Sequence, residues 1–178
     1  DEYLGIRFMP GAAGPLLGVD ARSLRDAVAP IQRVEFADAA GTIGVAGFDA
    51  VVRSWGARAS GDVPDPLVAA VAARIAVARG AMSVSTLADG TGLGYRQLLR
   101  RFRDATGLTP KEFARIRRVR AACMEALATS VPQWSSVSAD AGFADQSHLT
   151  REFRDVFGWP PRLVYEYLRR IEHRDVTV

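Results

Sequence analysis

The sequence has little of what metal or cysteine chemistry requires. Its 178 residues contain one cysteine, Cys123, and two histidines, His148 and His173. A single cysteine excludes a disulfide framework and a multi-cysteine zinc site. Two histidines leave few ligands for a metal and few groups for His-based catalysis. We therefore expect a protein that is not an enzyme and that uses no cofactor and no metal.

Long apolar runs and a targeting segment are also missing. The longest apolar stretch, Leu67–Ala78, is interrupted by Arg74 and is too short to cross a bilayer. No signal peptide is visible, so the sequence predicts a cytoplasmic protein without a membrane partner. The chain begins at Asp1 rather than at a methionine, from which we expect a fragment of a longer protein. The apolar fraction of 48% is typical of one globular domain or two small ones.

Lysine is scarce, and the remaining basic charge is unevenly distributed. Lys111 is the only lysine among 23 basic residues. Residues 1–66 hold six basic and nine acidic residues, whereas residues 67–178 hold 17 basic and 11 acidic residues. Within residues 83–120 there are nine bases and three acids. Such a stripe attracts polyanions, of which nucleic acid is the commonest, although charge alone also fits a solvated basic face.

The C-terminal half contains an internal repeat. The segment RRFRDATGLTP at residues 100–110 matches REFRDVFGWPP at residues 151–161, with six of eleven positions identical at an offset of 51. Leu98 and Leu149 precede the two segments at the same offset, and Gly92 pairs with Gly142 at an offset of 50. A duplicated supersecondary unit explains this pattern better than chance.

Each copy is predicted to form a helix, a tight glycine turn and a second helix. In each, apolar residues at helical spacing precede a glycine, and a Leu and a Phe four residues apart then place an apolar stripe on the next helix, which a further glycine ends. This arrangement is the helix-turn-helix motif, whose second helix fits the DNA major groove. The residues of the two patterns are Val84, Leu87, Ala88, Gly92, Leu98, Phe102 and Gly107, and then Trp134, Val137, Ala141, Gly142, Leu149, Phe153 and Gly158.

Two further helices are predicted around the first copy. Residues 110–127 keep a helical period, which indicates a rigid spacer of roughly 15 residues and about 22 Å. With the two motifs at its ends, such a spacer can separate two recognition helices by about one DNA turn, ~34 Å. Asp65-Pro66 is typical of a helix start and predicts an amphipathic helix over residues 67–79. We expect its inward residues to be Leu67, Val71, Ile75 and Ala78.

Residues 1–64 carry weaker patterns. Leu4–Phe8 alternates like a strand, and Ala21–Ala27 and Val45–Trp55 have short helical patterns. No glycine-rich turn is followed by Lys-Ser or Lys-Thr, so no nucleotide-binding loop is predicted. The predicted fold is mainly α: two helix-turn-helix subdomains joined by a long linker helix, preceded by a small mixed or helical N-terminal segment.

Residues ~80–170 resemble the AraC/XylS family of bacterial transcription regulators. SVSTLADGTGLGYRQLLRRFRDATGLTPKEF is similar to the family's first helix-turn-helix, and AGFADQSHLTREFRDVFGWPP to its second. The opening GIRFMPGAAGPLLGV resembles the end of an upstream sensor-like domain. Three positions depart from the pattern, because Gly94 replaces a capping Ser or Thr, Ser138 an alanine and Trp134 an isoleucine.

The resemblance implies a division of the chain. Residues 1–64 are then the remnant of the sensor-like domain, and residues 65–178 are the DNA-binding domain. Within it we expect the first helix-turn-helix at about 83–107, the linker helix at about 110–127 and the second helix-turn-helix at about 133–158. Each recognition helix would enter one of two successive major grooves.

The exposed faces of the two recognition helices carry the candidate DNA contacts. Arginine pairs with guanine O6 and N7, and glutamine with adenine N6 and N7. The resemblance implies that the base-reading residues are Arg96, Gln97, Arg100, Gln146, Ser147, Thr150 and Arg151. It implies phosphate contacts for Arg103, Lys111, Arg154 and Arg162. The alternative for each is a solvated helix residue.

The remaining candidates favour structural roles. We expect Cys123 to be a buried thiol, and Trp134, Phe143 and Trp159 to belong to the core. His148 is expected to pack or to contact a phosphate. Asp104 and Asp155, which recur in the repeat, are expected to stabilise their helices.

Double-stranded DNA is the expected partner, and the resemblance adds RNA polymerase and a small-molecule effector bound through the N-terminal region. Two alternatives stay open. One is a ligand-sensing or dimerising module formed by residues 1–64. The other is a DNA-alkyl repair protein, in which an AraC-like module accompanies a methyl-accepting cysteine, for which this chain offers only Cys123.

Overall fold

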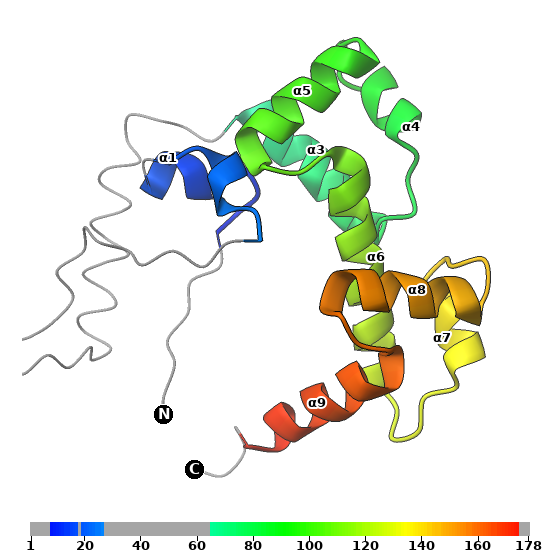
Figure 1. Cartoon of the computed structure of the whole chain (residues 1–178). Helices are drawn as coiled ribbons and strands as arrows, with labels where there is room; N and C mark the ends of the chain where they lie inside the picture. The colour runs from blue at the N-terminus through cyan, green and yellow to red at the C-terminus, as the bar shows by residue number, and fades with distance from the viewer. Residues whose placement is uncertain (1–7, 18, 27–64, 175–178) are drawn as a thin grey trace, which may run out of the picture. The chain divides into compact units, whose positions relative to one another are not determined.

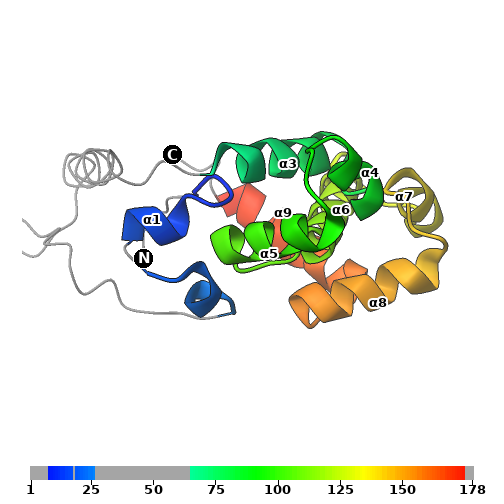
Figure 2. The same ribbon diagram turned by 90° about the horizontal axis from the view of Figure 1, so that it is seen from above.

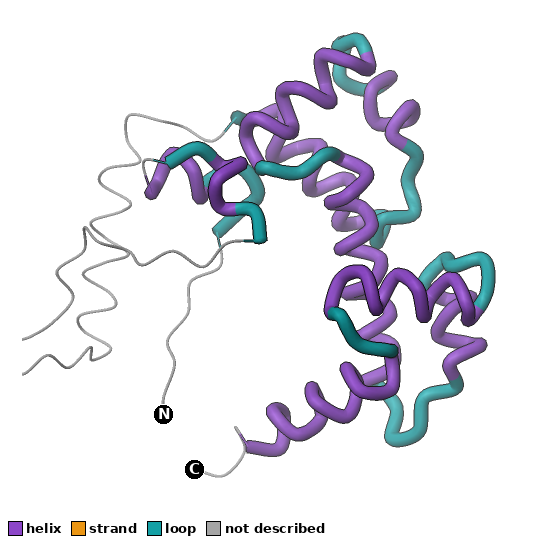
Figure 3. Tube along the Cα trace, viewed as in Figure 1, coloured by secondary structure: helices purple, strands orange, loops and turns teal. Residues whose placement is uncertain are grey.

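The computed structural model describes residues 8–17, 19–26 and 65–174, and all regular structure within these ranges is helical (Figures 1 and 3). The predicted mainly α class is confirmed. The elements are α1 (Ala13–Leu17), the 3₁₀ helix η1 (Ala21–Leu24), α3 (Pro66–Val77), α4 (Val84–Asp89), α5 (Tyr95–Thr106), α6 (Pro110–Leu127), α7 (Trp134–Asp140), α8 (Gln146–Phe157) and α9 (Pro161–Arg174).

The two predicted helix–turn–helix patterns coincide with α4–α5 and α7–α8. Leu98 and Phe102 on α5 are fully buried, and so are Leu149 and Phe153 on α8. The four glycines predicted to end helices all have positive φ, which a residue without a Cβ adopts at little cost. They are Gly92, Gly107, Gly142 and Gly158.

Predictions for the N-terminal region are tested only in part. Residues 4–7 of the predicted strand and all of Val45–Trp55 lie outside the described residues. The helical pattern that begins at Ala21 forms the 3₁₀ helix η1, which ends at Leu24. Asp20 caps this helix, because its side chain accepts a hydrogen bond of 2.8 Å from the backbone N–H of Arg22.

The helix α3 differs in detail from its prediction. Val71 and Ile75 are buried as expected, but Val68 and Ala72 complete the buried face, and Leu67 and Ala78 are only half-buried. Asp65 Oδ1 accepts hydrogen bonds from the N–H groups of Leu67 (3.0 Å) and Val68 (3.3 Å), so the predicted cap is confirmed.

The repeat extends beyond the segments that match in sequence. The buried residues of α3 are Val68, Val71, Ala72 and Ile75, and those of α6 are Val119, Ala122, Cys123 and Ala126. Each residue of the first set lies 51 positions before its counterpart in the second set. The duplicated unit is therefore three helices long: α3–α4–α5 in the first copy and α6–α7–α8 in the second.

The described chain divides into two compact units. The first contains the residues up to Ala72 together with residues 88–110, and the second contains residues 73–87 and 111 onward. The core of the second unit is formed by α6, α7, α8 and α9, with Phe143 in the turn between α7 and α8. The Arg118 guanidinium lies 5.8 Å from the centre of the Phe143 ring and donates a hydrogen bond of 2.8 Å to the Gly80 carbonyl.

The two recognition helices begin differently. Gly94 is the N-cap of α5 and offers no side-chain acceptor. Asp145, the equivalent residue before α8, accepts a hydrogen bond of 2.6 Å from the N–H of His148. An aspartate cap satisfies a backbone donor that would otherwise lack a partner inside the helix.

We expect Asp145→Ala to lower the free energy of unfolding by about 1 kcal/mol, because the cap of α8 is lost. Gly94→Ser should raise it by a few tenths of a kcal/mol, because the Gly94 backbone already has the extended conformation of a cap. Urea denaturation measures both, with Asp145→Asn as the control that keeps the acceptor. An unchanged midpoint for Asp145→Ala would contradict the assigned cap.

Candidate nucleic-acid interface

Burial of Leu98 and Phe102 determines which face of α5 is exposed. The predicted residues Arg96, Gln97, Arg100 and Arg103 are all exposed on this helix. Among the described residues, none of these three arginines forms an ion pair with a carboxylate. The helix therefore presents uncompensated guanidinium groups at i, i+4 and i+7, a spacing that follows one face.

The predicted residues of α8 lie together around one shallow hollow of about 380 Å³, which is lined by Gln146, Ser147, Thr150, Arg151 and Arg154. The Thr150 hydroxyl donates a hydrogen bond of 2.9 Å to the Gln146 carbonyl, so it offers a base only its acceptor lone pairs and its methyl group. Arg151 and Arg154 form no ion pair among the described residues. The hollow thus combines hydrogen-bonding side chains with two positive charges.

The two other predicted phosphate contacts lie at helix starts. Lys111 is exposed in the first turn of α6. Arg162 is exposed near the start of α9, where its Nε donates to Glu166 Oε1 at 2.8 Å. The charge of Arg162 is therefore partly compensated by its own helix, whereas Lys111 forms no ion pair within the part of the chain that the structure describes.

Ion pairs hold each recognition helix to the helix that begins its repeat. In the first unit, Arg101 of α5 donates two hydrogen bonds to Asp65, one of them of 2.9 Å from Nη2 to Oδ1. This bidentate contact lowers the pKa of the Asp65 carboxyl. Its effect is larger than that of the hydrogen bonds that the carboxylate accepts from the backbone N–H groups of Val68 and Leu67. Because only the ionised carboxylate accepts this full set of bonds, the anchoring is retained at neutral pH.

The equivalent contact in the second unit has the opposite polarity. Arg115 of α6 pairs with Glu152 of α8, and its Nη2 lies 2.8 Å from Asp155 Oδ2. Glu152 stands at the position equivalent to Arg101, so the recognition helix supplies the cation in one copy and the anion in the other. Glu152 is also 3.6 Å from His148 Nε2.

These anchoring residues were not predicted as a set. Asp104 and Asp155 were expected to stabilise their helices, and both form ion pairs, with Arg22 and Arg115 respectively. The partners lie 82 and 40 positions away in sequence, beyond the reach of helical periodicity. The only available signal was the recurrence of charged residues at equivalent positions of the repeat.

The aromatic predictions are partly wrong. Phe143 is buried, and Trp134 is half-buried with its ring edge against Tyr165 at 6.2 Å. Trp159 was expected in the core but is 49% exposed and packs only edge-on against Tyr167 of α9. It follows the C-terminal glycine of α8, where the chain turns at the surface. His148 packs edge-on against Phe143, and packing is one of the two roles predicted for it.

Cys123 is buried in the core of the second unit, as predicted. Burial raises the pKa of its thiol to about 11, so it is protonated at neutral pH. A reactive cysteine requires the thiolate and access to the reagent. Cys123 meets neither condition, which argues against a methyl-accepting role.

No helix of the described ranges is both long and apolar enough to span a membrane.

We predict that Cys123 in the folded protein at pH 8 reacts with a disulfide reagent on the order of a hundredfold more slowly than in 6 M guanidinium chloride, because its pKa is raised by about two units. Absorbance of the released thiol measures the rate. Equal rates in the two conditions would show that the thiol is accessible and ionised in the fold.

Two successive helix-turn-helix units make up this part of the chain, and the second helix of each buries a Leu and a Phe and exposes arginine and glutamine. This arrangement is a double helix-turn-helix domain, built from a motif whose second helix fits the DNA major groove. A helix-turn-helix domain family matches residues 87–169 of the chain. The match runs from within α4 to within α9 and so includes both recognition helices.

The chain is also similar to two HTH-type transcriptional activators. The chain is 37% identical over 83 residues to the HTH-type transcriptional activator RhaS of Escherichia fergusonii, covering 46% of this chain and 29% of that protein. It is 33% identical over 82 residues to RhaS of Enterobacter sp. (strain 638), with the same coverage. The chain therefore spans less than a third of the length of these relatives.

Solved structures show the same fold. The xylose-binding transcription activator XylR is similar with a TM-score of 0.52 at 17% identity, over 60% of this chain and 28% of that one. A probable AraC family transcriptional regulator from Rhodopseudomonas palustris CGA009 is similar with a TM-score of 0.50 at 24% identity, over 58% of this chain and 97% of that one.

Proposed function

We propose that this protein is a transcription regulator that binds double-stranded DNA sequence-specifically, with α5 and α8 each entering a major groove. The proposal rests on one observation, which is that both helices have a buried apolar face and an exposed polar face in the same arrangement. A buried Leu and Phe fix the inner face, and uncompensated arginines with hydrogen-bonding partners occupy the outer face. Because the two helices belong to one chain, a monomer reads an asymmetric site of two successive grooves.

The outer-face residues divide into base readers and phosphate contacts. Arg96, Gln97 and Arg100 of α5, with the Gln146–Arg151 face of α8, are close to the start of their helices, the end that approaches base edges in this motif. Their guanidinium, amide and hydroxyl groups form the kinds of hydrogen bond by which proteins recognise base edges. Arg103, Lys111, Arg154 and Arg162 position the domain on the phosphate backbone, which adds affinity without sequence preference. Contact with RNA polymerase, and an effector acting through the N-terminal region, belong to the same proposal through the family resemblance.

Selection from a random double-stranded DNA library, followed by sequencing, tests base reading. The wild type should enrich an asymmetric motif with two blocks about one helical turn apart. Arg100→Ala should remove the preference of one block and Arg151→Ala that of the other, each with a loss of about 1–3 kcal/mol against the best site. Arg170→Ala, which removes an exposed arginine of α9, is the matched control and should leave both blocks intact.

A motif with a single block would show that only one helix reads bases. Absence of any enrichment at low salt would overturn the proposal.

Salt dependence tests the phosphate contacts. The logarithm of the binding constant should fall linearly with the logarithm of salt concentration, because each neutralised phosphate releases counterions. Lys111→Gln should reduce the slope by about one unit and weaken binding to all sequences equally. Fluorescence anisotropy at four or more salt concentrations measures this. A changed sequence preference for Lys111→Gln would instead place this residue at a base.

A further inference from the structure

The described N-terminal segment, residues 8–17 and 19–26, lies beside α5 in both views of the ribbon (Figures 1 and 2). The approach is close at two glycines. A Cβ on Gly107, the C-cap of α5, would lie 2.5 Å from the Ala21 carbonyl oxygen of η1. A Cβ on Gly11 would touch Val68 and Ala105 at 3.6 and 3.8 Å. Backbone of the N-terminal segment therefore packs directly on the last turns of the first recognition helix.

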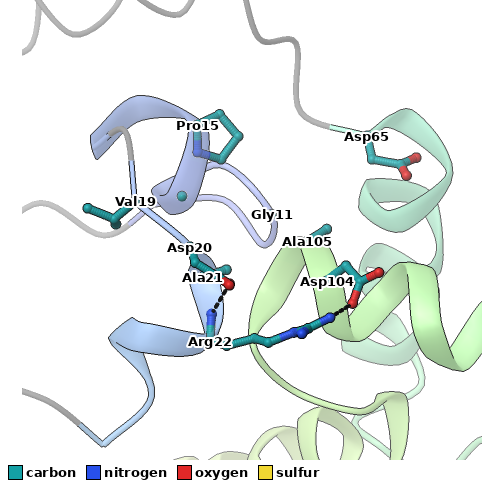
Figure 4. Close-up of a pocket in the computed structure, with 10 residues that line it drawn as sticks. Gly11, Pro15, Val19, Asp20, Ala21, Arg22, Asp65, Asp104 and Ala105 are labelled. Atoms are coloured by element: carbon teal, nitrogen blue, oxygen red, sulfur yellow. Dashed lines mark hydrogen bonds and ion pairs between the residues drawn. The ribbon is translucent and has the colours of Figure 1, made fainter.

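An ion pair joins the same two elements. Arg22 of η1 donates a hydrogen bond through Nη2 to Asp104 Oδ1 of α5, as Figure 4 shows. This hydrogen bond is the main reason that the pKa of the Arg22 guanidinium is raised. The surrounding pocket, of about 690 Å³, is also lined by the carboxylates of Asp20 and Asp65. Among the described residues that line it, Arg22 alone is basic.

The second copy of the repeat contains a cationic partner for the residue equivalent to Asp104, whereas the first copy does not. Its counterpart Asp155 is paired with Arg115, which belongs to the helix that begins the same repeat. In the first copy, Asp65 occupies the start of α3, one residue from the position equivalent to Arg115. A carboxylate cannot neutralise Asp104. The N-terminal segment supplies through Arg22 the contact that the second copy contains internally.

We propose that Arg22 is a positioning residue for DNA reading by α5, and that the N-terminal segment contributes to DNA reading by the first helix-turn-helix, α4–α5. Displacing this segment weakens base recognition by α5 and leaves recognition by α8 unchanged. A signal that moves the described N-terminal segment thus reaches one half of the binding site only. This inference rests on the proposed function, because it assigns a support to one of the two reading helices.

The first test compares Arg22→Ala with Arg115→Ala, the matched variant in the other copy. In the library selection, Arg22→Ala should weaken preference in the block that Arg100→Ala removes, and Arg115→Ala in the block that Arg151→Ala removes. Because the Arg22–Asp104 pair is solvent-exposed, we expect a 2- to 5-fold loss of discrimination. The double variant Arg22→Asp with Asp104→Arg keeps the net charge and should restore the first block.

The second test needs no DNA. Gly107→Ala and Gly158→Ala impose the same strain, since both residues cap a recognition helix at φ near +75°, but only Gly107 has backbone within 4 Å of its added Cβ. Hydrogen exchange should therefore accelerate in Ala21–Leu24 for Gly107→Ala and not for Gly158→Ala. Arg22→Ala should accelerate exchange in the last turn of α5 and leave α8 unaffected.

The outcomes separate the two proposals. If the wild type enriches a two-block motif and Arg22→Ala leaves the first block and the exchange of α5 unchanged, the positioning role is wrong while DNA reading stands. If Arg22→Asp with Asp104→Arg fails to restore the preference in the first block that Arg22→Ala loses, the ion pair between residues 22 and 104 does not position α5. If exchange changes as expected but no DNA is enriched, the packing is correct and the proposed function fails.

Discussion

The structure depends on the burial of one Leu and one Phe, four residues apart, on each recognition helix. Leu98 with Phe102, and Leu149 with Phe153, have essentially no exposed surface. Each pair fixes the rotation of its helix about its own axis, because burying two large side chains stabilises by several kcal/mol. The arginines and glutamines on the opposite face point outward as a consequence. A polar substitution in either pair would disturb this exposed face without changing any residue on it.

Ion pairs join the same elements and are directional, whereas apolar contacts are not. In the first copy, Arg101 holds the one carboxylate of Asp65 through two hydrogen bonds. In the second copy, Arg115 contacts two carboxylates, those of Glu152 and Asp155. The side chains differ, but the place on the fold is the same.

Local patterns in the sequence were sufficient to predict the helices, their glycine ends and the buried pairs, because these depend on residues within one or two turns. The buried face of α3 was predicted with a small error, because Leu67 and Val68 are equally apolar neighbours and the spacing of apolar residues alone does not distinguish them. The ion pairs to Arg22 and Arg115 were missed because they join residues far apart in sequence. Trp159 was misjudged because its size suggested burial, whereas its surface position follows from the turn after α8. The DNA-contacting roles are still predictions, since they depend on a molecule that the sequence does not describe.

The opposite polarity of the two anchoring ion pairs has a consequence for folding fidelity. A chain built from two similar three-helix repeats can assemble wrongly, with the recognition helix of one copy packed on the first helix of the other. Such an exchange would bring Arg101 beside Arg115 and Glu152 beside Asp65, so that like charges meet at both junctions. Only the correct pairing places opposite charges together. The reversal of charge between the copies therefore lets each repeat distinguish its own helices from those of its duplicate while the chain folds.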